Sequence, residues 1–299
     1  MTGRPNPPKR HHYLPEFHLR QWCGETGKLQ RYTAVCNNAV KTKRVFPSQI
    51  GFEQNLYAMP GESVDDWNAQ KLETHFFGPL DNKAAQCLAM LLNQDPAIKL
   101  TGNRSIWSTY ILSLFHRTPQ HLGALHRQMK KIYEEQTGQY QDEYEKFRGP
   151  NDPETFEEWE LKQDALIDEK RTLSLLPGLI ANSRLGDFTM KMRWTVKNVE
   201  NVKLELLLSD NPVIFSPLKK PMGHIVMPLS PTKLFIASND QDFHNYVSNI
   251  NPIRLVKDAN KLVVQNATQF VVAADMSQDY FIRKHFGTKI IGSLVSGFR

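Results

Sequence analysis

The sequence predicts an α+β protein with short N-terminal strands, a central helical block, and a C-terminal antiparallel or mixed sheet with terminal helices. Two observations support this fold class. Apolar residues recur at helical spacing through the middle of the chain, whereas both ends contain short apolar runs bounded by turn residues. Strands and helices also do not alternate as βαβ units, which argues against a doubly wound parallel sheet.

Length and composition predict one main domain. The chain has 299 residues, of which 40% are hydrophobic and 23% are charged, as is typical of globular proteins. Residues 1–10 contain Pro5, Pro7 and Pro8, so we expect them to form a disordered arm. Residues 11–299 are expected to form a single domain, with a helical lobe at about 63–187 inserted between sheet-forming segments.

The first strands are expected over residues 28–35 and 39–46. An Asn37-Asn38 turn separates them, and asparagine tolerates the positive φ that a tight hairpin needs. A third short strand is expected at 55–59.

Helical patterns fill the middle of the chain. Ser63 is a candidate N-cap for a helix that should end near Gly78-Pro79, and Thr118-Pro119 should begin another that reaches about residue 136. Pro177 is expected to kink or break the last of these helices. The remaining helices are expected around 88–92 and over 104–116, 153–170 and 173–181.

The pattern then returns to short strands. Residues 190–196, 204–208, 224–227 and 233–236 are predicted to be strands of one sheet. A helix over 252–265, a strand over 270–273 and a helix over 277–286 should complete the chain.

Charge is distributed unevenly. The net charge is +6; residues 1–50 carry nine Lys and Arg against two acidic residues, and residues 141–170 carry eleven acidic residues against four basic ones. The basic N-terminal region could bind nucleic acid, and the acidic helix 141–170 could meet a protein partner. The simpler interpretation is that both are solvated surfaces. No apolar run is long enough for a membrane partner, and no signal peptide is evident, so a cytoplasmic location is expected.

Common catalytic and nucleotide-binding signatures are missing. The sequence contains no Walker A motif, no GxGxxG before a helix, no HExxH and no GxSxG. We therefore predict no nucleotide cofactor.

The densest chemistry-bearing group is His11, His12 and His18. Imidazoles can bind metal ions or transfer protons near neutral pH, but adjacent histidines on a strand point to opposite sides. The structural interpretation is one buried, hydrogen-bonded histidine and two at the surface.

Three carboxylates also stand out. Glu73 and Asp81 are eight residues apart, close to two helical turns, although Gly78-Pro79 makes a shared face doubtful. Asp210 directly follows an apolar strand, where a metal ligand or general base is common. An Asx-turn before Pro212 is an equally good interpretation of Asp210.

Several segments together resemble one family. The sequence contains His11-His12-Tyr13-x-Pro15-x-Phe17-x-Leu19, Gly51 with Asn55-Leu56-Tyr57, Glu73, Arg117-Thr118-Pro119, Ser209-Asp210-Asn211-Pro212-Val213, Pro228-Leu229-Ser230-Pro231 and Asn266-Ala267. These segments, in this order, resemble the domain of unknown function 4238 family, which is mainly bacterial. The family tends to have a second glutamate where this chain has Asp81. The resemblance implies one continuous domain and no settled activity; a role in defence against phage is suggested only by the bacterial distribution.

The polar residues singled out suggest two functions. The first is a metal-dependent nuclease or phosphoester hydrolase acting on nucleic acid, with His12, Glu73 and Asp210 holding Mg²⁺, Mn²⁺ or Zn²⁺. In that hypothesis Arg117 steadies the phosphate, His11 transfers a proton and Asn211 orients the substrate or a water. The alternative is a non-catalytic nucleic-acid- or protein-binding module, in which the same side chains form a buried structural network.

Overall fold

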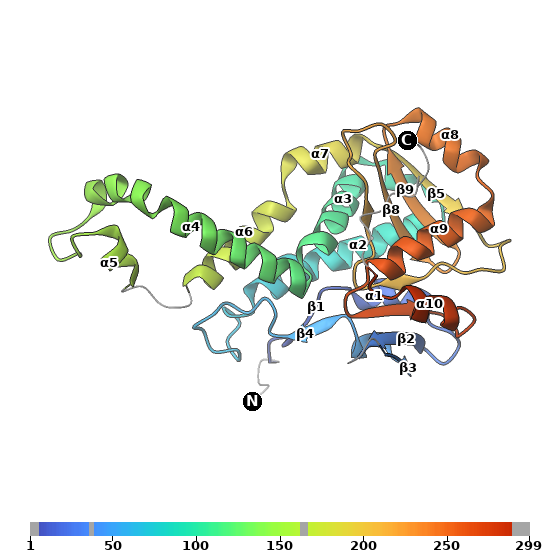
Figure 1. Cartoon of the computed structure of the whole chain (residues 1–299), viewed down its shortest axis with the longest axis horizontal. Coiled ribbons are helices and arrows are strands. Elements are labelled where there is room, and N and C mark those ends of the chain that lie inside the picture. The colour runs from blue at the N-terminus through green and yellow to red at the C-terminus, as the bar shows by residue number, and fades with distance from the viewer. Residues whose placement is uncertain (1–5, 36–38, 162–166, 289–299) are drawn as a thin grey trace.

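The computed structural model describes residues 6–35, 39–161 and 167–288 and confirms the α+β fold class (Figure 1). Part of the expected arm is ordered, because Pro7 is buried and Arg10 begins the first strand. Residues 1–5 of that arm lie outside the described residues.

The two ends of the chain share one sheet. Strands β2 (Leu29–Ala34) and β3 (Val40–Val45) form the expected hairpin, and the sheet has the order β3-β2-β10-β6. Strand β10 (Phe270–Ala273) pairs antiparallel with β2, with Val271 opposite Tyr32. Strand β6 (Leu208–Ser209) completes the sheet on the other side of β10. Alternate residues of β10 enter two different cores, so the sheet is covered on both faces.

A second sheet has the order β5-β9-β8-β7 and is antiparallel throughout. It consists of β5 (Arg193–Asn198), β9 (Lys233–Ser238), β8 (His224–Ser230) and β7 (Ile214–Phe215). Every residue of β8 is buried. Three of the four segments expected in one C-terminal sheet, those of β5, β8 and β9, share this sheet, whereas the segment at 204–208 leads into β6, which pairs with β10 and joins the N-terminal hairpin.

A small two-stranded sheet begins the fold. Strand β1 (Arg10–His12) pairs antiparallel with β4 (Phe52–Gln54), and the short helix α1 (Glu16–Leu19) follows β1. The strand expected at 55–59 is wrong, because Asn55 has a φ of 57° and turns the chain instead.

The helical block lies between β4 and β5 along the chain. Figure 1 shows α4, α5 and α6 projecting away from the sheets. Its helical segments are η4 (Glu73–Phe77), α2 (Gly78–Leu92), η5 (Pro96–Lys99), α3 (Thr101–His116), α4 (Pro119–Phe147), α5 (Phe156–Leu161), α6 (Ile167–Ile180) and α7 (Ser183–Lys191). Short 3-10 helices η1 (Arg20–Trp22) and η3 (Pro47–Gln49) lie before this block, and α8 (Gln241–Asn249), α9 (Pro252–Gln265) and α10 (Asp279–His285) lie after it.

Several helix boundaries differ from those expected. The chain from Ser63 to Gln70 forms turns, and the helix that follows continues through Gly78-Pro79. Helix α4 begins with the expected Thr118 cap but extends to Phe147, and Pro177 lies inside α6 without ending it. Part of the helix expected over 153–170 falls in 162–166, outside the described residues.

Buried apolar side chains form three clusters. The largest joins α1, α2 and α3 to the inner faces of both sheets, the second lies beneath α8, α9 and α10, and the smallest lies between Tyr57, Phe77 and α6. None of the helices in the described part of the chain is both long and apolar enough to cross a membrane.

Candidate functional site

A pocket of about 310 Å³ lies between α1 and the helix formed by η4 and α2; we call it the α1–α2 pocket. Its lining mixes acidic, basic and imidazole groups from the first strand, α1 and the helix. The residues are His12, Pro15, Glu16, Phe17, Arg20, Glu73, Asp81, Asn82 and Ala85. Two of the residues selected from the sequence, His12 and Glu73, therefore face the same space.

A π-helical segment places Glu73 and Asp81 in this pocket together. Pro79 has no N–H group, and just before it the Gly78 N–H donates to the Glu73 carbonyl five residues earlier. This wider turn accommodates the proline without ending the helix. Because the π-helical turn contains more residues than an α-helical turn, the eight residues from Glu73 to Asp81 make close to two complete turns. The two carboxylates therefore lie on the same face of the helix, which the Gly78-Pro79 sequence had made doubtful.

Arg117 lies beneath the pocket and pairs with Asp81. Its Nη1 is 2.9 and 3.1 Å from the two Asp81 carboxylate oxygens, and its side chain is 0% exposed. The guanidinium carbon is 5.6 Å from the Phe77 ring centre and 5.4 Å from that of Tyr110. Because Arg117 is enclosed, its side chain does not face the pocket. It contacts Asp81, and its positive charge contributes to the electrostatic field at the pocket.

Burial changes the protonation of the acidic groups. Desolvation by burial raises the pKa of Glu73 to about 7; the nearby Asp81 charge raises it further, whereas Arg117 opposes the shift. Burial likewise raises the pKa of Asp81, against the charge and hydrogen bonds of Arg117. At neutral pH Glu73 is therefore divided between its protonated and ionised forms.

The pKa of His12 shifts in the opposite direction. Burial lowers its pKa, the Glu16 charge partly restores it, and the Arg117 charge lowers it again. The His12 Nε2 and the Glu16 Oε1 are 3.7 Å apart, beyond hydrogen-bond distance. His12 is consequently neutral at pH 7 and can accept a proton.

Four polar atoms around this pocket are buried but make no hydrogen bond to another described residue. They are the His12 Nε2, the Glu73 Oε2, and the Nε and Nη2 of Arg117. Buried polar groups are nearly always satisfied, and leaving one unpaired costs about 1–3 kcal/mol. The His12 Nε2 and the Glu73 Oε2 belong to side chains that line the pocket, so a bound ligand can complete their hydrogen bonding, whereas the two Arg117 atoms are enclosed beneath it.

His11 faces away from the pocket. Its Nδ1 accepts from the Tyr57 backbone N–H at 2.8 Å, its Nε2 is 3.2 Å from the Pro8 carbonyl, and its ring stacks on Tyr57. Both ring nitrogens are thus used in joining β1 to the turn after β4. Adjacent strand residues alternate in direction, which separates His11 from His12.

Asp210 is buried and fully hydrogen-bonded. Its carboxylate accepts from the backbone N–H groups of Thr268, Gln269 and Phe270 and from the Thr268 hydroxyl. The adjacent Asn211 donates its Nδ2 to the Asn266 carbonyl at 3.0 Å. These contacts fasten the segment that leads into β10.

The predicted metal ligands do not converge. Among the described residues, no three His, Cys, Asp or Glu side chains are grouped closely enough to hold an ion. Asp210 already accepts several hydrogen bonds, whereas His12 and Glu73 line the α1–α2 pocket. The residues present therefore do not fit the divalent centre expected from the sequence.

Some residues of the α1–α2 pocket escaped sequence selection. Glu16 lies four residues after His12, at a spacing that a helix can bring together, and Arg20 lies four residues after Glu16. Asn82 follows a proline that predicted a break, whereas Asp81 was already noted in the sequence as a carboxylate of interest. The i,i+4 spacing could have identified Glu16, but nothing in the sequence marked the π-helical segment.

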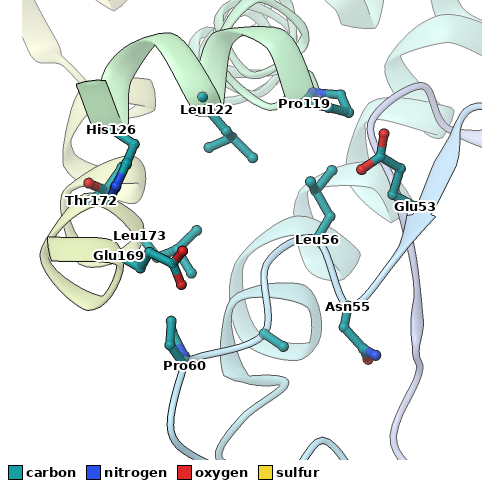
Figure 2. A pocket seen from close by; sticks show the side chains of 12 residues that line it. Glu53, Asn55, Leu56, Pro60, Pro119, Leu122, His126, Glu169, Thr172 and Leu173 are labelled. Atoms are coloured by element: carbon teal, nitrogen blue, oxygen red, sulfur yellow. The ribbon is translucent and has the colours of Figure 1, made fainter. Parts of the chain in front are cut away.

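A second pocket, of about 360 Å³, lies between β4, α4 and α6 and contains none of the six selected residues (Figure 2). Figure 2 shows Glu53 on one side of this pocket and Glu169 and His126 on the other. Leu122 and Leu173 contribute apolar surface to the same lining.

The chain was compared with protein families, curated proteins and solved structures. A family model described as protein of unknown function (DUF4238) matches residues 10–277. No curated protein and no solved structure matched the chain.

Proposed function

Because the chain belongs to the DUF4238 family, whose description names no activity, we propose a function from its geometry: hydrolysis of a phosphoester in nucleic acid. The α1–α2 pocket is the proposed active site. The observation that carries the proposal is the convergence of a neutral imidazole and a carboxyl of raised pKa, both with unsatisfied polar atoms, in one pocket.

In this mechanism, His12 is the general base and Glu73 the general acid. The neutral His12 takes a proton from the attacking water as its oxygen bonds to phosphorus. Protonated Glu73 gives its proton to the leaving oxygen as the phosphorus–oxygen bond to it breaks. Both groups are then restored by proton exchange with solvent.

Charge around the pocket can support a phosphate. The Arg20 side chain lines the pocket and is 65% exposed, which allows it to contact a bound anion. Arg117 is a positioning residue, because it contacts Asp81 and is enclosed. Arg117 therefore does not take the phosphate-binding role expected from the sequence, and Arg20 takes that role in this mechanism.

The test is cleavage of labelled RNA and DNA by the purified protein, with Mg²⁺, with Mn²⁺ and with chelator. We expect Glu73→Gln and His12→Asn each to reduce the rate by about 100-fold or more. The wild-type rate should fall as pH rises through about 7, because Glu73 loses its proton there.

Matched controls are available nearby. His75→Asn changes an exposed histidine on the same π-helical segment, and Glu62→Gln changes an exposed glutamate before it; both should retain the wild-type rate. Unchanged cleavage by the folded Glu73→Gln and His12→Asn variants would overturn the assignment. A requirement for added Mg²⁺ or Mn²⁺ would place the ion with ligands other than the set of His12, Glu73 and Asp210.

The second candidate is a non-catalytic binding module. It is favoured by the hydrogen-bonded burial of His11 and Asp210 and by the exposed side chains of Lys41, Lys43 and Arg44 on β3. These cations could contact phosphates, whereas the acidic α5 and the distal part of α4 could contact a protein. Absence of cleavage under every condition, with binding retained, would select this candidate.

A further inference from the structure

A third pocket, of about 650 Å³, lies between the α3–α4 junction, β7 and the segment before β10; we call it the α3–β7 pocket. It is lined by Phe115, Gln120, His121, Ala124, Asn211, Val213, Ile214, Phe215, Asn266 and Thr268. This size is within the range of small-molecule sites. Of the described residues that line it, none carries a formal charge, apart from histidine if protonated.

Aromatic rings form one wall. Phe115 is 42% exposed, and its ring centre is 4.3 Å from that of His121 and 5.5 Å from that of Phe215, which it meets edge-on. An aromatic ring held by neighbouring rings yet still accessible is a platform on which another planar ring can stack.

A fixed hydrogen-bond acceptor lies in the same lining. The Nδ2 of Asn211 is committed to the Asn266 carbonyl, whereas its Oδ1 accepts nothing from any residue that the structure describes. Asp210, through its bonds to residues 268–270, holds this segment in place. The Asn211 amide is therefore oriented before any ligand binds.

His121 supplies a donor. The Thr118 hydroxyl oxygen accepts from the His121 backbone N–H and lies 2.9 Å from its Nδ1. When that hydroxyl donates to Nδ1, the ring hydrogen is on Nε2. Burial lowers the pKa of His121, which keeps the imidazole neutral at pH 7.

The first turns of α4 separate this pocket from that of Figure 2. Gln120, His121 and Ala124 line the α3–β7 pocket, whereas Pro119, Leu122 and His126 line the other. Helical periodicity places these two sets on different sides of α4. The α3–β7 pocket is thus a distinct site.

We propose that the α3–β7 pocket binds a nucleobase, stacked on Phe115 and bonded at its edge by Asn211 and His121. A planar ring carrying both donors and acceptors matches the aromatic wall and the paired polar groups. The absence of Lys and Arg from the lining favours the base over the phosphate of a nucleotide. This site goes beyond the proposed hydrolysis, because it shares no residue with the α1–α2 pocket.

Calorimetric titration tests the proposal with adenosine, guanosine, cytidine and uridine, a short single-stranded oligonucleotide, and ribose 5-phosphate as the probe without a base. We expect at least one nucleoside or the oligonucleotide to bind, and ribose 5-phosphate not to bind. Binding of nucleosides would indicate a site for free bases or nucleosides, whereas binding of the oligonucleotide alone would indicate bases within a strand.

Phe115→Ala should weaken that binding about tenfold or more, which corresponds to the loss of one stacked base. Phe147→Ala, at a ring on α4 that is 85% exposed, is the matched control and should leave affinity unchanged. Asn211→Ala should also weaken binding and change the preference among bases. Glu73→Gln should retain full binding, which separates failure at this site from failure of hydrolysis.

Three outcomes would overturn the base-binding site. They are no binding of any nucleoside or of the oligonucleotide, equal binding of ribose 5-phosphate, and wild-type affinity in a folded Phe115→Ala variant. Because Phe115 is substantially exposed, its truncation should leave the fold intact.

Discussion

Glu73 and Asp81 bring the same chemical group to one pocket, but their partners differ. Asp81 is held by Arg117 through two short contacts, whereas one Glu73 oxygen is buried with no partner among the described residues. A carboxyl that is buried without compensation favours its protonated form in the folded protein. Its ionisation must then reduce stability.

This gives a pH dependence whose direction is fixed. The pKa of Glu73 is about 7 in the folded protein and near 4.5 ordinarily, so its protonation stabilises the fold fully below about pH 4.5. The contribution is lost as pH rises from about 4.5 through 7, with a total of about 3 kcal/mol. Glu73→Gln, measured by urea unfolding between pH 4.5 and 8, should remove this slope and be more stable than wild type above pH 7.

The same measurement on Glu62→Gln provides the reference, because Glu62 is exposed. Equal slopes for wild type and Glu73→Gln would show that Glu73 does not titrate in this window.

Only part of the site could be predicted from single residues. His12 and Glu73 line one pocket and Arg117 lies beneath it, whereas His11, Asp210 and Asn211 hold other segments together. Residue type identified groups capable of chemistry, but it could not show whether their hydrogen bonds were already used. That depends on backbone groups more than 40 residues away, as for Asp210 with Thr268.

Among the elements, those with strong local signals were predicted well. The β2–β3 hairpin, α3, the Thr118 cap, α9 and β10 follow their sequence patterns closely. Two predictions were wrong because the backbone geometry differs from what the pattern indicates. The helix does not end at Gly78-Pro79, because a π-helical segment accommodates the proline. No strand forms at 55–59, because Asn55 has a positive φ. The sequence also did not indicate which strands pair, since β6 pairs with β10, in which Val271 lies opposite Ser209.

Gly51 lies just before β4, where the backbone conformation and a close contact with Leu14 leave no room for a side chain. Its φ is +72°, a Cβ there would lie 2.7 Å from the Leu14 carbonyl oxygen, and its own carbonyl accepts from the backbone N–H groups of Tyr13 and Leu14. Gly51→Ala should therefore reduce the free energy of unfolding by about 2 kcal/mol or more, as measured by urea denaturation.

Gly186 in α7 is the matched control. A Cβ at Gly186 would meet nothing within 4 Å, and helical Gly→Ala changes typically stabilise by about 0.5–1 kcal/mol. If Gly51→Ala were as stable as Gly186→Ala, Gly51 would not constrain the junction between β1 and β4.

Across the whole molecule, opposite charges occupy different regions. The basic residues of β3 lie on an edge strand, and the acidic α5 lies in the projecting helical region (Figure 1). Edge-strand lysines also discourage pairing with other chains, which is the structural alternative to nucleic-acid contact.

A double variant, Lys41→Gln/Lys43→Gln, distinguishes nucleic-acid contact by β3 from protection of the sheet edge. If β3 contacts phosphates, the double variant should weaken binding of single-stranded RNA and lower the slope of log affinity against log salt by about 1–2. Lys203→Gln/Lys257→Gln removes the same charge from exposed positions elsewhere and should leave that slope unchanged. Equal slopes in both variants would assign β3 to edge protection alone.

The pairing of β2 with β10 also affects how the chain can be made. Ribosomes add about 5–20 residues per second, so roughly 10–50 seconds separate the synthesis of Ala34 from that of Ala273. Throughout that interval the nascent hairpin has an unpaired inner edge and an uncovered Tyr32. The four-stranded sheet can close only late in translation, and until then the open edge of β2 is available for pairing with other chains.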